Sequence, residues 1–88
     1  MKFAAARPYA APEAAARKLI EIANSVEAVQ DGRIHIELIN GPMLFEHKAT
    51  PAEYTAAGLK LAIDRGWIEM HESGTFVRVT QVGADLFA

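Results

Sequence analysis

The chain of 88 residues contains no cysteine. Disulfides and cysteine-ligated zinc sites are therefore excluded, and a reducing compartment is compatible with the sequence. A membrane-spanning helix needs about 20 consecutive apolar residues, and no run in the chain approaches that length. The first residues lack the apolar core of a secretory signal, because Arg7 and Pro8 interrupt the alanines. We expect a cytoplasmic protein that does not interact with membranes.

An excess of charge of one sign is also missing, since 9 basic and 11 acidic side chains give a net charge of −2. No global field therefore attracts nucleic acid or an anionic membrane. The chain has no glycine-rich phosphate loop and no paired-carboxylate motif, and its histidines, His35, His47 and His71, match no metal-ligand spacing. We expect a protein without catalytic activity, metal or cofactor.

The most informative stretch begins at Thr50. Thr50 and Glu53 form a capping box around Pro51, which suits the first position of a helix. Gly66 suits the left-handed residue that follows a helix, and Arg65 suits the negative end of the helix dipole. These signals predict a helix from about Pro51 to Arg65.

The two faces of this helix differ in composition. One face is apolar or small, and we expect it to face the core: Ala52, Thr55, Ala56, Leu59, Ala62 and Ile63. The other face carries a stripe that is typical of neither core nor surface: Tyr54, Gly58, Leu61 and Arg65.

A two-stranded hairpin is predicted directly after Gly66. Trp67–Glu72 and Phe76–Thr80 alternate between apolar and polar residues, and Ser73 and Gly74 supply the turn. Thr80 then caps a short helix from Gln81 to about Phe87. We expect Trp67 to lie at the centre of the core, and we expect the last helix to dock on the first one through three apolar side chains, Val82, Leu86 and Phe87.

The N-terminal half is predicted from the same kinds of signal. Residues 1–11 show no periodicity and are expected to form a flexible arm before a single domain at 12–88. An apolar repeat predicts a helix from Pro12 to about Gln30, and strict alternation predicts a strand over Arg33–Leu38. Asn40-Gly41-Pro42 predicts a turn. Residues 42–49 are left open between a short helix and an extended segment, and in both cases we expect Leu44 and Phe45 in the core.

The predicted order is helix, strand, short link, capped helix, hairpin and terminal helix, which makes a small α+β domain. This order resembles the winged helix-turn-helix fold of bacterial regulators. Leu61–Glu69 is similar to the end of a recognition helix that enters a wing, and Gly74–Gly83 is similar to the second wing strand with its threonine-capped exit. The resemblance covers roughly Glu13–Phe87. It normally includes a full helix before the recognition helix. Only Gly41–Ala49, which contains one proline, is available for it here, so we expect that helix to be short or absent.

The resemblance implies a transcriptional-regulator module that binds double-stranded DNA. The residues that it implies for DNA binding are Tyr54, Thr55, Lys60, Arg65 and Arg78. Base readout needs arginine, lysine, asparagine or glutamine, and the predicted recognition helix contains only one lysine and one arginine. An alternative is therefore a protein-interaction or homodimerisation module that does not bind DNA, with contacts through Tyr54, Gly58 and Leu61. The residues leave both hypotheses open.

Overall fold

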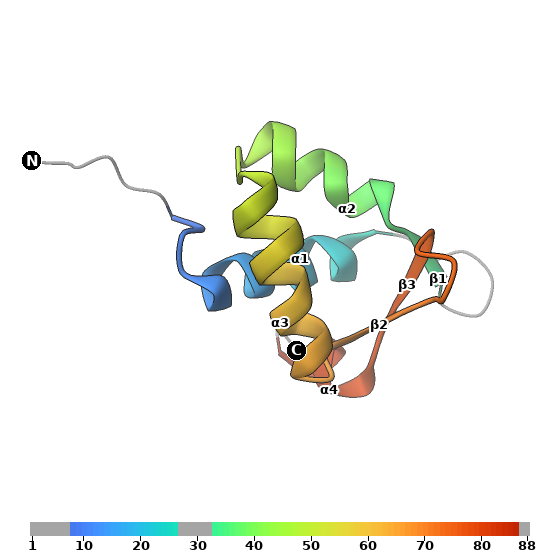
Figure 1. The fold of residues 1–88 in the computed structure, drawn as a ribbon. Helices are drawn as coiled ribbons and strands as arrows, with labels where there is room; N and C mark the ends of the chain where they lie inside the picture. Colours follow the sequence, from blue (N-terminus) through green and yellow to red (C-terminus); the bar gives the residue numbers. More distant parts are fainter. Residues whose placement is uncertain (1–7, 27–32, 87–88) are drawn as a thin grey trace, which may run out of the picture.

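The computed structural model describes residues 8–26 and 33–86, which form an α+β fold with helices packed beside a three-stranded antiparallel sheet (Figure 1). The elements, in which η marks a helical segment of the wider π type, are α1 (Pro12–Ser25), β1 (Arg33–His35), α2 (Glu37–Gly41), η2 (Pro42–Glu46), η3 (Ala52–Gly58), α3 (Leu59–Asp64), β2 (Ile68–Met70), β3 (Phe76–Val79) and α4 (Gln81–Asp85).

Helix α1 forms the base of the core, as predicted. Pro12 occupies the start of the helix and Glu13 its first turn, where an acid is favourable. The apolar side is completely or almost completely buried, with Ala15, Ala16, Leu19, Ile20, Ile22 and Ala23. The helix ends at Ser25, and the predicted extension to Gln30 lies largely outside the described residues.

The predicted strand at Arg33–Leu38 is wrong after His35. Pairing with β3 ends where His35 faces Phe76, and Ile36 already donates its backbone N–H to the carbonyl of Thr75 in the hairpin turn at 2.8 Å. With no strand left to pair with, the chain turns at Ile36 and continues as helix. A helical repeat overlaps the end of this alternation. Ile39 and Met43 are both fully buried and lie four residues apart, which places them on one side of a helix.

Segments α2 and η2 therefore form one helical stretch over 37–46. Of the two expectations for this helix, short or absent, absence is wrong. Asn40, Gly41 and Pro42 lie inside it and do not form a turn; Gly41 has a helical φ of −56°. Residues 42–49 were left open between a short helix and an extended segment, and the structure shows that 42–46 are helical. Lys48, at a left-handed φ of 58°, then turns the chain toward η3. Phe45 is 77% exposed, so its predicted place in the core is wrong.

The capped helix is present as predicted, as the continuous pair η3 and α3. The backbone N–H of Glu53 donates to the Thr50 hydroxyl at 3.1 Å, and the backbone N–H of Thr50 donates to the Glu53 carboxylate at 2.9 Å. This is the reciprocal capping box. Gly66, at φ 73°, ends the helix in the left-handed conformation that glycine adopts most easily.

The predicted core face of this helix is confirmed only in part. Leu59 and Ala62 are buried as predicted, together with Tyr54 and Gly58 from the other stripe, whereas the remaining four residues predicted to face inward are exposed. A π-type turn holds more residues than an α-turn, so the wheel drawn at 3.6 residues per turn loses its phase across η3.

The contact between η3 and α1 explains which face is buried. A Cβ placed on Gly58 would lie 2.7 Å from the Cβ of Ala15, so the two helices meet where neither has a larger side chain. The yellow η3 crosses in front of the blue α1 in Figure 1, and α3 continues along the same contact.

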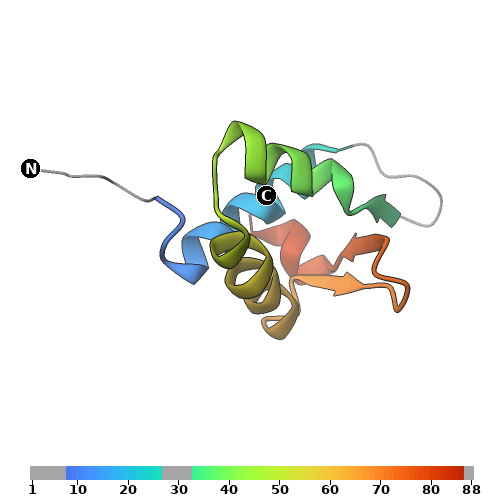
Figure 2. The same cartoon turned by 45° about the horizontal axis from the view of Figure 1, so that its top comes forward.

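The hairpin forms as predicted. Strand β3 is central in the order β1-β3-β2, and Gly74 turns the hairpin at φ 77°. The hairpin projects to one side of the helices (Figure 2). The Thr80 hydroxyl accepts from the backbone N–H of Gly83 at 3.1 Å and so caps α4 as predicted. Leu86 packs against the core, but Val82 is 56% exposed, so its predicted docking is wrong.

Tyr9 departs from the predicted flexible arm. Its side chain is partly buried against the core, and its ring meets the His47 ring edge-on with centroids 6.1 Å apart. The folded part of the chain therefore begins before Pro12. Residues 1–7 of the predicted arm lie outside the described residues.

Replacing Trp67 with alanine should destabilise the domain by about 3–5 kcal/mol, because it empties a large core position that is only 6% exposed. Urea unfolding followed by circular dichroism measures this. Phe45→Ala removes another large aromatic side chain, but one that is 77% exposed, and should change stability by less than about 0.5 kcal/mol. Equal losses in the two variants would contradict the assignment of Trp67 to the core.

Gly58→Ala should destabilise the domain more than Gly41→Ala. A Cβ at Gly58 overlaps Ala15 and should cost about 1–3 kcal/mol. A Cβ at Gly41 meets nothing within 4 Å outside its chain neighbours, but Gly41 is helical directly before Pro42, where a Cβ is disfavoured, so alanine should change stability by less than about 1 kcal/mol. The same unfolding experiment compares them, and a stabilised Gly58→Ala variant would refute the close packing of η3 on α1.

Candidate interaction surfaces

The outward face of η3 and α3 is the side turned away from α1, and we define it by its exposed side chains Ala52, Thr55, Ala56, Lys60 and Ile63. Two predicted DNA contacts, Thr55 and Lys60, lie on it. The Lys60 ammonium forms an ion pair with the Asp64 carboxylate, Nζ to Oδ2 3.0 Å, one helical turn along. The outward face is therefore mostly apolar, and its one lysine is neutralised locally.

Tyr54 lies on the opposite side of the helix, inside the domain. Its side chain is 1% exposed, and its hydroxyl donates to the Oδ1 atom of Asn40 in α2. Burial raises the pKa of the Tyr54 hydroxyl, because the phenolate would lose its hydration. Tyr54 joins η3 to α2 and presents no surface to DNA or to a protein partner.

Gly58 and Leu61 also face inward. Gly58 is buried against Ala15, and Leu61 is partly buried against the core. The stripe that the sequence offered as a protein interface is therefore packed inside the same chain, against α1, α2 and the core.

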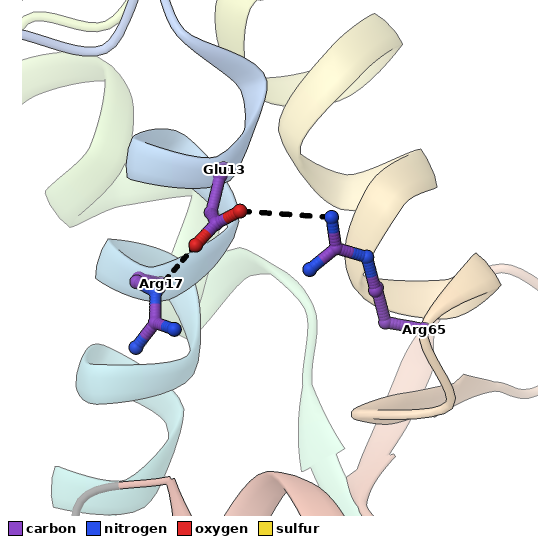
Figure 3. Close-up of polar contacts among 3 residues, drawn as sticks. All are labelled: Glu13, Arg17 and Arg65. Carbon is purple, nitrogen blue, oxygen red and sulfur yellow. Dashed lines mark hydrogen bonds and ion pairs between the residues drawn. The ribbon is translucent and has the colours of Figure 1, made fainter.

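Arg65 belongs to a cluster that links α3 to α1 (Figure 3). The Glu13 carboxylate contacts the Arg17 Nε atom at 3.1 Å and the Arg65 Nη2 atom at 3.6 Å. The two guanidinium groups lie over the Trp67 ring, 5.7 Å and 5.5 Å from its centroid. Arg17, and to a smaller extent Arg65, holds the pKa of Glu13 below its ordinary value of 4.5. Arg65 thus covers the central tryptophan, and its charge is shared with Glu13.

Arg78, the last predicted DNA contact, lies on the sheet and not on the helix. It is exposed on β3, where its Cα partners are Arg33 on β1 and Glu69 on β2. Directly opposite residues of an antiparallel sheet share one face, so these three side chains form a row across its outward side.

Exposed apolar side chains are the surface feature that sequence reasoning missed. The large ones are Leu38, Phe45, Ile63 and Val82. Ile63 had been placed in the core because it shares one face of a regular helical wheel with Leu59 and Ala62.

No protein-family model, curated protein or solved structure matches the chain. The described residues contain no helix with the length and apolar character that crossing a bilayer requires. Over the same residues, no three histidine, aspartate or glutamate side chains are grouped to hold a metal ion.

Acidification should weaken the Glu13 cluster. Since the folded protein holds the pKa of Glu13 below 4.5, the stability from its ion pairs is present above that pH and is lost as the pH falls through the lowered value. Thermal unfolding should show wild type more stable than Glu13→Gln at neutral pH, with the difference vanishing in acid. Glu21→Gln, which removes a single i,i+3 pair with Lys18, is the matched control. A difference that persists at the lowest pH would contradict this account.

Proposed function

We propose that this domain is a protein-interaction module on a winged-helix-like scaffold, and that it pairs with a second copy of itself through the outward face of η3 and α3. The observation that carries the proposal is the character of this face. Ala52, Thr55 and Ala56 are exposed and Ile63 is 38% exposed, although their composition is that of a core-facing helix. Burial of apolar surface is the main driving force for protein association.

A second copy fits this face by shape. The large Ile63 lies at the C-terminal end of the outward face, whereas the N-terminal end and the centre carry Ala52 and Ala56. Two copies related by a two-fold axis present the same patch to each other. An antiparallel crossing centred near Ala56 therefore brings the small side chains of the two helices together, which lets the helices approach closely, and it sets each isoleucine beside the start of the partner helix.

The charges of the face are compatible with pairing. Lys60 and Asp64 neutralise each other within one copy, so two copies bring no unbalanced charge together. The same neutrality disfavours duplex DNA, whose binding depends on cations that contact phosphates.

DNA binding is the second candidate, and the element order favours it. A helix at 37–46 precedes η3 and α3, and a hairpin follows them, as in the winged helix-turn-helix family that the sequence resembles. Thr55 and Lys60 are exposed on the helix that would enter the major groove. A cytoplasmic location belongs to both proposals, since the chain has no cysteine that needs an oxidising compartment.

Ile63→Glu should weaken self-association at least about tenfold, because each interface would bury two unpaired carboxylates. Sedimentation equilibrium over a range of concentrations measures this. Val82→Glu places the same charge at an exposed valine on α4 and should leave association unchanged. A wild-type chain that stays monomeric at high concentration would reject the homodimer.

A titration with a generic duplex at two salt concentrations tests the second candidate. DNA binding requires amide shifts at Thr55 and Lys60 that fade as salt increases, and it requires weaker binding by Lys60→Ala. If no shifts occur at low salt, DNA binding is rejected, whatever the outcome of the association experiment.

A further inference from the structure

The outer side of α2 and η2 is a second exposed surface with apolar side chains, and it lies on a different helix from the outward face of η3 and α3. We call it the α2–η2 face and define it by its exposed side chains Glu37, Leu38, Phe45 and Glu46. Leu38 is 43% exposed and Phe45 is 77% exposed, whereas Ile39 and Met43 of the same helical stretch are fully buried. The green α2 and η2 stretch lies along the top edge of the domain in Figure 1. Two large apolar side chains are therefore in solvent on a helix that the core already holds in place.

The space between these two side chains is open. Gly41 lies three residues after Leu38 and four residues before Phe45, so the three positions are on one side of the helix. A Cβ placed on Gly41 would meet no side chain within 4 Å beyond those of its chain neighbours, so neither large side chain closes over the glycine. The α2–η2 face therefore has a shallow notch at Gly41 with an apolar side chain at each end, and an apolar side chain of a partner helix fits such a notch.

Both ends of the α2–η2 face are acidic. Glu37 precedes Leu38, Glu46 follows Phe45, and the stretch between the two glutamates contains no basic residue. Over residues 8–26 and 33–86, neither carboxylate has an ion-pair or hydrogen-bond partner, and Lys48, two residues after Glu46, does not pair with it. Interfaces bring opposite charges together, so the charge that complements this face is positive. The same carboxylates repel the phosphates of nucleic acid.

A second copy of this chain is a poor match for the face, because its helical cations are already in use. The basic side chains on the described helices and their ends each pair with a carboxylate of the same chain: Arg17, Lys18, Lys60 and Arg65. A copy that docked one of these helices would break an existing ion pair for each new one that it formed. A different protein with unpaired lysine or arginine side chains gains the contacts without that loss.

We propose that the α2–η2 face binds a basic amphipathic helix of a different protein. An apolar side chain of that helix lies over Gly41, between Leu38 and Phe45, and a cation on either side of it contacts Glu37 or Glu46. The two glutamates are separated by roughly 13 Å along the helix axis, a span that two lysines seven residues apart on a partner helix reach with their long side chains. This inference does not rest on the proposed self-association, which uses another helix.

The test is an amide chemical-shift titration of the full chain with a synthetic peptide. The probe is an acetylated and amidated helical peptide of alanine and glutamine that carries lysine, leucine, leucine and lysine at positions i, i+3, i+4 and i+7. The expected result is saturable shifts centred on Leu38, Gly41 and Phe45, with binding that weakens as salt increases. A matched peptide with glutamate in place of both lysines should bind at least about tenfold more weakly, because its charges would face Glu37 and Glu46.

Phe45→Ala should weaken binding of the lysine peptide at least about tenfold, because it removes one end of the notch. Val82→Ala removes an exposed apolar side chain on α4 and is the matched control, which should bind the peptide as wild type does. Both side chains are mostly exposed, so both variants should retain the folded spectrum.

The proposal is overturned if the lysine peptide causes no saturable shifts, if the glutamate peptide binds equally well, or if Phe45→Ala binds the lysine peptide as tightly as wild type. Sedimentation equilibrium distinguishes a second copy as the occupant. A dimer that is lost in Phe45→Ala but retained in Ile63→Glu would assign the α2–η2 face to self-association, and it would also overturn the proposal.

Discussion

The close contact between Gly58 and Ala15 is the constraint on which the rest of this structure depends. It lets η3 lie directly on α1, with the glycine position only 2.7 Å from the alanine methyl once a Cβ is added. With the helices this close, Tyr54 is carried into the core and reaches Asn40 on α2. The same contact places the end of α3 beside the first turn of α1, where Glu13 meets Arg65. One pair of small residues therefore sets the orientation of three helices.

The choice of buried face also determines the surface. The capped helix has two sides that could face a core, and α1 covers the side with Tyr54 and Gly58. The side with Ala56 and Ile63 is left to solvent. The proposal of self-association follows from this division, because the exposed side carries core-like residues and a lysine that is already paired.

The features that the sequence predicted correctly are local ones. The capping box at Thr50, the left-handed glycines at Gly66 and Gly74 and the threonine cap at Thr80 each depend on residues within a few positions of one another. The errors depend on distant partners. The strand ends at His35 because β3 has no further residue for it to pair with. The alternation of apolar and polar residues does not show where a partner strand ends.

The phase of the capped helix failed for a related reason. Its π-type segment and its contact with Ala15 decided which side was buried, and neither can be read from a wheel of 3.6 residues per turn. Of the five predicted DNA contacts, Tyr54 is buried and the other four, Thr55, Lys60, Arg65 and Arg78, are exposed. The apolar outward face was visible in the sequence, but only as a predicted core.

The absence of cysteine gives the most direct test of the central claim, which is antiparallel pairing through the outward face. A single Ala56→Cys variant places one thiol at the centre of that face, and a disulfide across the two-fold axis requires the two Cα atoms to approach within about 7 Å. Under mild oxidation in solution, the account predicts a covalent dimer from Ala56→Cys and far less from the exposed control Val82→Cys. Equal cross-linking of both variants, or none at position 56, would contradict it.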